Sequence, residues 1–251
     1  MQNIIVVIPC YNEAERLDAQ RFVSAAKSDP SLSFLFVDDG SRDATRTVLQ
    51  RASEQLPAQL SALSLDQNAG KAEAVRRGLQ AAFERSPGIV AYLDADLATP
   101  LEELGPMRAL FEAQPELQAV LGSRVGLLGR DVVRKPTRHY LGRIFASVAS
   151  VLLDLNVYDT QCGAKLFRNT PAVRSIFAEP FSVSWTFDVE VLARLAKLAR
   201  DGAIPPLARS AMEHPLRRWR DVAGSKLKPS AAIKAGTELA TLWRKYGKSP
   251  F

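Results

Sequence analysis

The chain has 251 residues, of which 47% are apolar and 24% charged, and it carries a formal net charge of +6. This composition excludes an intrinsically disordered or low-complexity chain. The length fits one large α/β domain or two small ones, and we expect one, which buries roughly 70 to 75% of its unfolded surface.

The first half of the chain alternates short apolar runs with amphipathic stretches. The apolar runs predict strands at residues 3–9, 33–39, 60–65, 88–96 and 118–124. The amphipathic stretches predict helices at residues 13–27, from residue 41 onward, at 70–85 and at 101–112. Repeated strand and helix units with continuous apolar strands predict an α/β fold with a mostly parallel sheet covered by helices on both faces.

The start of the chain and its hydropathy bear on its location. The first predicted strand begins by Asn3, which leaves no room for a signal peptide. No apolar run approaches the roughly 18 residues that a membrane-spanning helix needs. We therefore expect a cytoplasmic protein that is not secreted and has no transmembrane segment.

Polar residues follow four of the predicted strands. They are PCYNE at 9–13, DDGS at 38–41, DAD at 94–96 and GSR at 122–124. Any one of these groups could be ordinary turn or capping chemistry, with Ser41 as the N-cap of the next helix. In parallel sheets, however, ligands bind at the carboxyl ends of the strands. Four polar groups at that edge predict a binding site.

Two common phosphate-binding motifs do not fit. The first strand is followed by PCYNEAER rather than by a glycine-rich GxGxxG, so no nicotinamide or flavin site is expected. Residue 65 is Leu, where a P-loop that ends at Gly70 and Lys71 would need a glycine. Gly70 and Lys71 at a helix start could still meet a phosphate through backbone N–H groups and one ammonium.

Asp94 and Asp96 alternate at the end of the fourth predicted strand. Two hard oxygen ligands at this spacing suit a divalent cation, Mg²⁺ or Mn²⁺, that also takes oxygens from a diphosphate. An aromatic ring and a carboxylate in PCYNE, together with Asp38, could hold a base and a ribose. The polar residues at the carboxyl ends of the strands, called the rim below, therefore predict a site for a nucleoside diphosphate with a metal.

Basic residues gather in the second half of the chain. Residues 124–143 hold six Lys and Arg against one Asp, and residues 216–234 hold another six against one. A solvated face, an anionic substrate, an anionic membrane surface and nucleic acid all fit such clusters. Because the sequence has no zinc-finger spacing and no RNP-like motif, we expect no nucleic-acid partner.

Two segments in these clusters mix cations with apolar residues. In residues 134–155, helical spacing leaves one apolar face, which suits either an ordinary buried helix or a lipid surface; its residues are Ile144, Phe145, Val148, Val151 and Leu152. In residues 216–228, Trp219 lies among five Lys and Arg, as in interfacial loops.

The motifs in order resemble those of inverting family 2 glycosyltransferases with the GT-A fold. They are VVIPCYNE, FVDDGSRDAT, NAGKAEAVRRG, AYLDADLATP, LGSR, DTQCGAKLF, WTFDVEVL and GSKL. The resemblance runs from about residue 4 to residue 245 and is closest to the polyprenyl-phosphate branch, especially dolichyl-phosphate β-glucosyltransferases. It implies a Rossmann-like GT-A domain over residues 1–251, with a nucleotide-sugar half at about 1–123 and an acceptor and membrane-facing half, with C-terminal helices, at about 124–251.

The resemblance also implies roles for individual residues. The residues expected to bind the nucleotide sugar are Pro9, Tyr11, Asn12, Glu13, Asp38, Gly70, Lys71, Asp94 and Asp96. Asp94 and Asp96 would also bind the metal, and Asp39 would serve the turn. Arg124, Arg138 and Lys226 are expected to meet the acceptor phosphate, with Arg124, Arg138 and Asp188 forming the catalytic group.

The expected reaction is transfer of a hexose, glucose from a uridine nucleotide, to a polyprenyl or dolichyl phosphate with inversion. Ala98 stands where mannosyltransferases of the family have glutamine, which argues against GDP-mannose. The glucosyltransferase-like members usually carry an N-terminal membrane anchor. Because no transmembrane segment is expected here, any attachment is expected to be peripheral, at the cytoplasmic membrane face.

Two other interpretations stay open. If the acceptor is a hydroxyl of a glycan or lipid, a base becomes necessary, and Asp188 is the candidate; otherwise Asp188 is an ordinary carboxylate at a helix N-terminus. A nucleotide-binding module without turnover is the other interpretation. A receiver-type phosphoacceptor is roughly half this length and would not need the DAD, GSR and QCGAK motifs.

Overall fold

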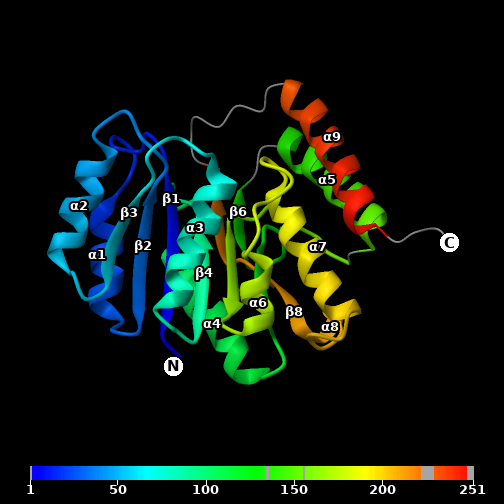
Figure 1. Cartoon of the computed structure of the whole chain (residues 1–251), viewed down its shortest axis with the longest axis horizontal. Helices are drawn as coiled ribbons and strands as arrows, with labels where there is room; N and C mark the ends of the chain where they lie inside the picture. The colour runs from blue at the N-terminus through cyan, green and yellow to red at the C-terminus, as the bar shows by residue number, and fades with distance from the viewer. Residues whose placement is uncertain (1, 134–135, 155, 222–228, 248–251) are drawn as a thin grey trace.

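The structure, a computed structural model, describes residues 2–133, 136–154, 156–221 and 229–247, apart from the side chains of 136–141, 152 and 229–233 (Figure 1). Its centre is a seven-stranded sheet with the strand order β3-β2-β1-β4-β7-β5-β8, and β6 and β9 form a separate two-stranded sheet. The strands are β1 (Ile4–Cys10), β2 (Leu32–Asp38), β3 (Leu60–Ser64), β4 (Ile89–Leu93), β5 (Ala119–Ser123), β6 (Asp131–Val133), β7 (Ala164–Arg168), β8 (Ala211–Pro215) and β9 (Arg218–Arg220).

Helices cover both faces of the large sheet (Figure 1). They are α1 (Ala19–Ser28), α2 (Thr45–Gln55), α3 (Lys71–Glu84), the 3₁₀ turn η1 (Leu101–Glu103), α4 (Leu104–Ala113), α5 (Pro136–Leu153), α6 (Pro171–Ile176), α7 (Phe187–Arg200), α8 (Leu207–Ser210) and α9 (Pro229–Tyr246). In the described part of the chain, no helix is both long and apolar enough to cross a membrane.

The strand β1 shows why the sheet needs helices on both sides. Its residues are apolar without interruption from Ile4 to Ile8, and all five are buried. Because side chains alternate along a strand, Val7 packs with α3 and α7 on one face while Val6 packs with α1, α2 and α4 on the other. This confirms the expected α/β fold with a mostly parallel sheet.

One strand runs against the others. β7 is inserted between β4 and β5 and is antiparallel to both, whereas β1, β2, β3 and β4 are parallel to their neighbours in that part of the sheet. Leu93, the last residue of β4, therefore pairs with Ala164, the first residue of β7. The antiparallel strand brings the segment before Ala164 to the edge where the parallel strands end.

Two helices begin later than the sequence predicts. α1 begins at Ala19 rather than Glu13, because Asp18 is its N-cap and the carbonyl of Glu13 accepts N–H groups in a separate turn. α2 begins at Thr45, and the expectation that Ser41 is its N-cap is wrong. The Ser41 hydroxyl instead accepts the N–H of Asn12 at 3.0 Å.

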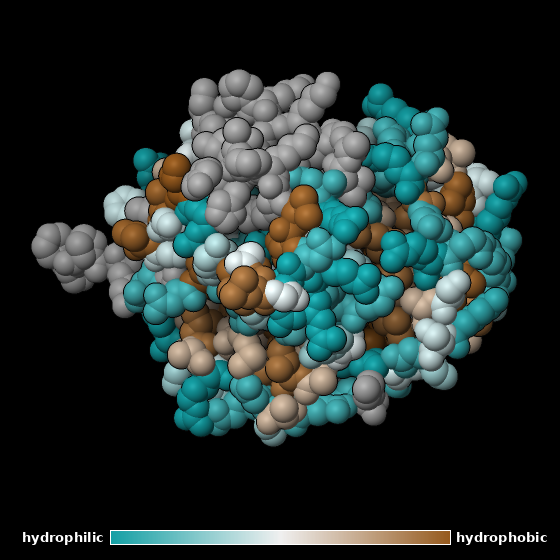
Figure 2. Space-filling view, turned by 180° about the vertical axis from the view of Figure 1, so that it is seen from behind, coloured by the Kyte–Doolittle hydropathy of each residue, from teal (hydrophilic) through white to brown (hydrophobic). Residues whose placement is uncertain are grey.

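The C-terminal helices form a layer of their own beside the sheet, where α9 packs against α5 and α7 (Figure 1). α5 keeps Ala149 and Leu153 in the core but leaves Ile144, Val148 and Val151 exposed. The opposite side of the molecule shows hydrophobic residues in small groups among hydrophilic ones (Figure 2).

A carboxylate of α9 joins this layer to the start of α7. Glu238 accepts the backbone N–H groups of Ser184, Trp185 and Thr186, with the shortest bond, 2.7 Å, at Thr186. A helix N-terminus leaves such N–H groups without partners inside the helix, so a carboxylate from a neighbouring helix stabilises it. Burial raises the pKa of Glu238, but the bonds from Thr186 and its neighbours lower it more, and the pKa lies below its usual value.

This contact yields a stability prediction. A carboxylate with a lowered folded-state pKa stabilises the fold above its unfolded pKa, and this stabilisation is lost as the pH falls through the folded pKa. We expect Glu238→Gln to lower the free energy of unfolding at pH 7 by about 1 to 3 kcal/mol. The difference from the parent should shrink below about pH 4. Denaturant titrations at several pH values measure this, with the exposed Glu84→Gln as control; equal stability of Glu238→Gln and the parent at pH 7 would contradict it.

Candidate functional site

The polar residues after β1 and β2 are joined to each other. The side-chain carbonyl of Asn12 accepts the N–H of Arg42 at 2.9 Å, and the N–H of Glu13 donates to the Thr45 hydroxyl at 2.8 Å. Asn12 itself has a positive φ of 53°, a conformation that asparagine tolerates better than most residues. Asn12 thus bridges the two loops.

Two other predicted residues lie on either side of this bridge. Pro9 is half-buried in β1, opposite Val37 of β2, and the ring of Tyr11 is exposed beside the loop. The ring is free to stack on a planar ligand. The role of all these residues in binding a nucleotide stays a prediction.

The two aspartates that end β2 are both buried but serve different neighbours. Asp38 accepts the N–H of Ser41 at 3.0 Å and the guanidinium of Arg46 at 3.1 Å. Asp39 accepts the backbone N–H groups of Ala69 at 2.8 Å and Gly70 at 2.9 Å. Burial raises the pKa of Asp39, and the bonds from Ala69 and Gly70 oppose that rise.

Asp39 therefore fixes the loop that leads into α3, and one expectation needs correction. The N–H of Gly70 was expected to be available to a phosphate, but it already donates to Asp39. Gly70 has a φ of 88°, which lets the loop turn into α3 and places Lys71 as the first residue of the helix. Asp39 serves the turn, as the resemblance implied.

Lys71 reaches across the rim to the end of β4. Its Nζ lies 2.5 Å from Oδ1 of Asp94 and 5.9 Å from the centre of the Phe187 ring. Burial lowers the pKa of Lys71, but the charges of Asp94 and Asp188 more than offset it, so its pKa is raised and it stays an ammonium. The structure thus brings Lys71 and Asp94 together as one ion pair.

Asp96 differs from the other rim carboxylates. It is exposed, and within the described residues it accepts the N–H of Ala98 at 3.0 Å and forms no ion pair, although the charges of Lys71 and Arg16 act to lower its pKa. Burial, and then the charge of Asp94, raise the pKa of Asp96. Burial raises the pKa of Glu13, and the charge of Asp96 adds to that rise while Arg16 opposes it. The buried Oε2 of Glu13 has no hydrogen-bond partner among the described residues.

These oxygens fit a divalent cation. Carboxylate oxygens that repel one another and lack donors are stabilised by a hard cation such as Mg²⁺ or Mn²⁺. In the part of the chain that the structure describes, no three acidic, His or Cys side chains form a complete metal-binding group. Any cation held at Asp94 and Asp96 would take its other ligands from water or from a bound diphosphate.

The segment before β7 completes the surroundings of Asp94. The N–H of Asp94 donates to the carbonyl of Gly163 at 3.1 Å. A Cβ added at Gly163 would lie only 2.1 Å from Oδ2 of Asp94. Position 163 therefore needs glycine so that the carboxyl group of Asp94 can lie against it.

Arg124 is held by Asp159, to which the sequence analysis gave no role. Its Nε and a terminal nitrogen donate to both oxygens of Asp159, each at 2.7 Å, and its guanidinium lies 5.3 Å from the Trp219 ring. Asp159 and Tyr158 in turn donate their backbone N–H groups to Glu213 of β8. The charge of Asp159, set against burial, raises the pKa of Arg124.

Asp188 lies in the first turn of α7 and is 5% exposed. Its Oδ1 accepts the hydroxyl of Tyr92 and pairs with Nζ of Lys165 at 2.5 Å. Tyr92 and Lys165 face each other across β4 and β7. A buried lysine needs such a partner, so Asp188 has a structural role in addition to any catalytic one.

The remaining expected residues are not all described. Arg138 lies in α5, but its side chain is outside the described residues, as is the whole of Lys226. Asp159 and Lys165 belong to the DTQCGAKLF motif, which was the signal available in the sequence. Glu213 and Tyr92 gave no such signal, because their roles depend on strand neighbours.

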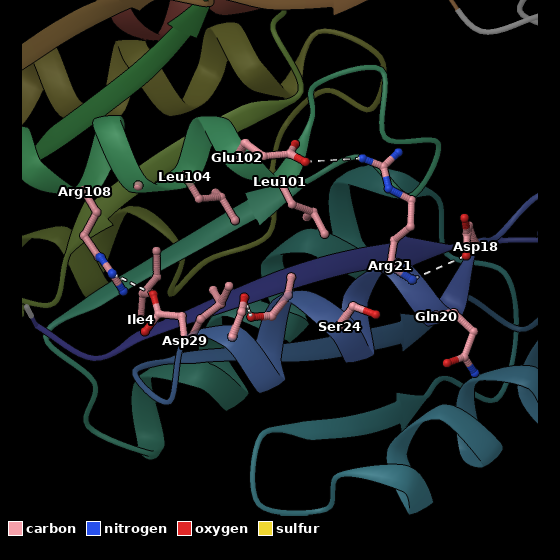
Figure 3. Close-up of a pocket in the computed structure, with 14 residues that line it drawn as sticks. Ile4, Asp18, Gln20, Arg21, Ser24, Asp29, Leu101, Glu102, Leu104 and Arg108 are labelled. Atoms are coloured by element: carbon pink, nitrogen blue, oxygen red, sulfur yellow. Dashed lines mark hydrogen bonds and ion pairs between the residues drawn. The ribbon is translucent and has the colours of Figure 1, made fainter.

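A groove of about 570 Å³ lies elsewhere, between α1 and the segment from η1 to α4 (Figure 3). Ion pairs cross it from Arg21 to Glu102 and from Arg108 to Asp29. It reaches Ile4, at the amino end of β1, and none of the predicted site residues lines it. The candidate site is the rim rather than this groove.

Comparison with known proteins identifies the family. The model described as glycosyl transferase family 2 matches residues 5–174. The chain belongs to glycosyl transferase family 2. It is 32% identical to the dolichyl-phosphate beta-glucosyltransferase of Dictyostelium discoideum, over 96% of this chain and 74% of that protein. It is 30% identical to the protein of the same name from Homo sapiens, over 91% of this chain and 70% of that protein.

Solved structures agree on the fold of this family 2 glycosyltransferase. Glucosyl-3-phosphoglycerate synthase from Mycobacterium tuberculosis, in complex with Mn²⁺, UDP-glucose and phosphoglyceric acid, superposes with a TM-score of 0.66. The two sequences are 18% identical, and the match covers 97% of this chain and 79% of that one. The expected GT-A fold and the resemblance to family 2 are thereby confirmed.

The contact of Gly163 with Asp94 yields a test of the site. We expect Gly163→Ala to displace the Asp94 carboxyl group and to weaken UDP binding roughly ten to a hundredfold, the loss of one charge-assisted contact of about 1.5 to 3 kcal/mol. Calorimetry with UDP and Mn²⁺ measures this. Gly105→Ala is the matched control, because an added Cβ there meets nothing within 4 Å. Unchanged UDP affinity in Gly163→Ala would contradict the placement of the nucleotide site at Asp94.

Proposed function

We propose that this family 2 glycosyltransferase transfers glucose from UDP-glucose to a polyprenyl or dolichyl phosphate, with inversion at the sugar C1. The observation that carries the proposal is the 32% identity to a dolichyl-phosphate beta-glucosyltransferase over 96% of the chain. Asp96, which forms no ion pair within the described residues, lies near the ion pair of Lys71 with the partly exposed Asp94, and this supports the proposal from the chemistry of the site.

The donor would lie along the carboxyl ends of β1, β2 and β4. The exposed ring of Tyr11 is available to stack on the base. Asp38 keeps acceptor capacity for a base N–H, because a carboxylate offers about four lone-pair sites and Ser41 and Arg46 use two. The ammonium of Lys71 would donate hydrogen bonds to the diphosphate, either in place of Asp94 or together with it.

A divalent cation, Mg²⁺ or Mn²⁺, would be held by Asp96 and Asp94. When bound, it neutralises the negative charge that grows on the leaving diphosphate. The two carboxylates fix its place at the end of β4, and Gly163 keeps Asp94 in position. Glu13, whose Oε2 has no hydrogen-bond partner within the described residues, would be a candidate for a further oxygen ligand.

The acceptor needs little activation if it is a phosphate monoester. Its second pKa is near 6, so its oxygen is largely an anion at pH 7. Arg124, Arg138 and Lys226 would align this anion for in-line attack on C1. Asp159 holds the guanidinium of Arg124 in a fixed orientation, which presets that alignment.

A hydroxyl acceptor is the second candidate, because Asp188 lies close to Lys71 at the rim. Its Oδ1 already accepts from Tyr92 and pairs with Lys165, which leaves Oδ2 to take a proton. Because Asp188 is buried and compensates the buried Lys165, we favour the phosphate acceptor, which does not require a base.

The lipid acceptor places the enzyme at a membrane. We infer peripheral attachment at the cytoplasmic membrane face, supported by the exposed Ile144, Val148 and Val151 on α5. These residues are spaced so that they share one side of the helix.

The role of the metal can be tested by removing a metal ligand or the metal itself. Asp96→Asn keeps the size of an exposed side chain but loses its charge, so we expect a normal fold and a loss of most turnover. Excess EDTA should have the same effect on the parent enzyme, and Mg²⁺ or Mn²⁺ should restore it.

The assay follows release of UDP from UDP-glucose in the presence of a polyprenyl phosphate. Asp201→Asn, a change of the same kind at the far end of α7, is the control and should act like the parent. Full activity of Asp96→Asn, or of the parent in excess EDTA, would remove the metal from this mechanism.

A further inference from the structure

The loop between β5 and β6 carries two leucines at its tip. Leu127 is 47% exposed, and Leu128 is fully exposed at 104%. The N–H of Arg130 donates to the carbonyl of Leu127 at 3.1 Å, and Gly129 has a φ of 79°, so the tip is a tight turn. Single exposed apolar residues are common, but two adjacent leucines at the end of a turn point to a surface that is covered in use.

The two-stranded sheet next to this tip has an apolar and basic outer face. β6 and β9 pair Val132 with Trp219. Trp219 is buried against the body of the protein, so the expectation that Trp219 itself is an interfacial residue is wrong. Because side chains alternate along a strand, the residues on either side of this pair point outward. Val133 is 56% exposed there, next to Arg220, which is also exposed.

The charge of this surface is positive. Four arginines lie at the tip and on or next to β9, Arg130, Arg217, Arg218 and Arg220, against the two acids Asp131 and Asp221. Asp131 pairs with Arg220 at 2.7 Å, and four arginines against two aspartates leave this surface with a formal charge of +2. Leucine with arginine around it suits the boundary between the headgroups and the acyl chains of an anionic bilayer.

The position of the loop agrees with this partner. The loop starts at Arg124, the residue expected to meet the acceptor phosphate, three residues before Leu127. Three residues of chain span at most about 10 Å. Since the phosphate of a polyprenyl lipid lies at the bilayer surface while its chain stays in the hydrocarbon, the bilayer has to approach the rim where this loop lies.

We propose that the Leu127–Leu128 tip inserts into an anionic phospholipid bilayer, with the arginines of β9 among the headgroups. The proposal rests on the proposed function for the need of a lipid acceptor. It names the part of this chain that docks and the partner, which is the bilayer surface rather than a second protein.

Binding to vesicles tests the proposal. The full chain is sedimented with vesicles of phosphatidylcholine alone or with 30% phosphatidylglycerol, and we expect it to bind the anionic vesicles. Leu127→Ser/Leu128→Ser should lose roughly tenfold or more in affinity, because two large apolar side chains no longer enter the bilayer. Arg218→Ser/Arg220→Ser should also bind less, with a weaker dependence on salt.

Val148→Ser/Val151→Ser tests separately the exposed residues of α5 that support peripheral attachment above, and we expect it to weaken vesicle binding less than the tip variant does. If the tip variant binds like the parent, the proposal is wrong, whatever the α5 variant does. Failure of the parent to bind anionic vesicles overturns it as well.

A fluorescence probe locates the tip directly. Both native cysteines are buried, so Leu128→Cys offers one accessible thiol for an environment-sensitive label. We expect a blue shift on adding anionic vesicles and quenching by lipids that carry bromine on the acyl chain. An unchanged spectrum would overturn the proposal.

A soluble acceptor separates the proposal from the proposed function. With a short-chain, water-soluble polyprenyl phosphate and no vesicles, the tip variant should turn over UDP-glucose like the parent. Reduced vesicle binding with normal turnover of the soluble acceptor supports both. Binding of vesicles through the tip, without turnover of any polyprenyl phosphate by the parent, refutes the proposed function and leaves the docking surface in place.

Discussion

Charge compensation at one edge of the sheet is the constraint on which the site depends. Parallel strands end side by side, so the carboxylates that follow them come together and repel one another. In the structure, a hydrogen-bond or ion-pair partner compensates most of these charges. The pairs are Asp38 with Arg46, Asp39 with the N–H groups of Ala69 and Gly70, Asp94 with Lys71, Asp159 with Arg124, and Asp188 with Lys165.

Asp96 stands apart from this scheme. Among the described residues it forms no ion pair, and Asp94 and Glu13 repel it. The cations whose charges lower its pKa, Lys71 and Arg16, are already paired with Asp94 and Glu13. An uncompensated charge in an otherwise balanced rim marks the place where the protein lacks something that its ligand supplies. A divalent cation with a diphosphate meets that need, because it brings positive charge together with its own oxygen ligands.

The antiparallel strand β7 connects the two halves of the site. Its insertion beside β4 places Gly163 against Asp94 and Lys165 beneath Asp188, and the residues just before it supply Asp159 for Arg124. One short stretch of chain thus supports residues that we propose for the donor and residues that we propose for the acceptor. We infer that a change in this stretch affects both substrates, whereas a change in the loop after β1 affects the donor alone.

The sequence could predict the rim because its signals are local. An apolar run followed by DD or DAD marks a strand end, and a parallel sheet gathers such ends without any further information. The sequence could not predict that Asp39 accepts a hydrogen bond from the N–H of Gly70, because the two residues lie 31 positions apart. It could not predict that Glu238 caps α7 either, because Glu238 lies 52 positions from Thr186. The start of α1 was also out of reach, because the turn after Glu13 has the composition of a helix.

Transfer of label to lipid is the measurement that tests the central claim most directly. The chain is incubated with UDP-[¹⁴C]glucose or GDP-[¹⁴C]mannose and a dolichyl phosphate in vesicles, and the butanol-extractable lipid is counted before and after mild acid. The account predicts that label from UDP-glucose enters the lipid and that mild acid releases it as free glucose, as expected of a sugar phosphodiester. Label that enters only from GDP-mannose, or that stays on the lipid in acid as a glycoside does, would contradict the account.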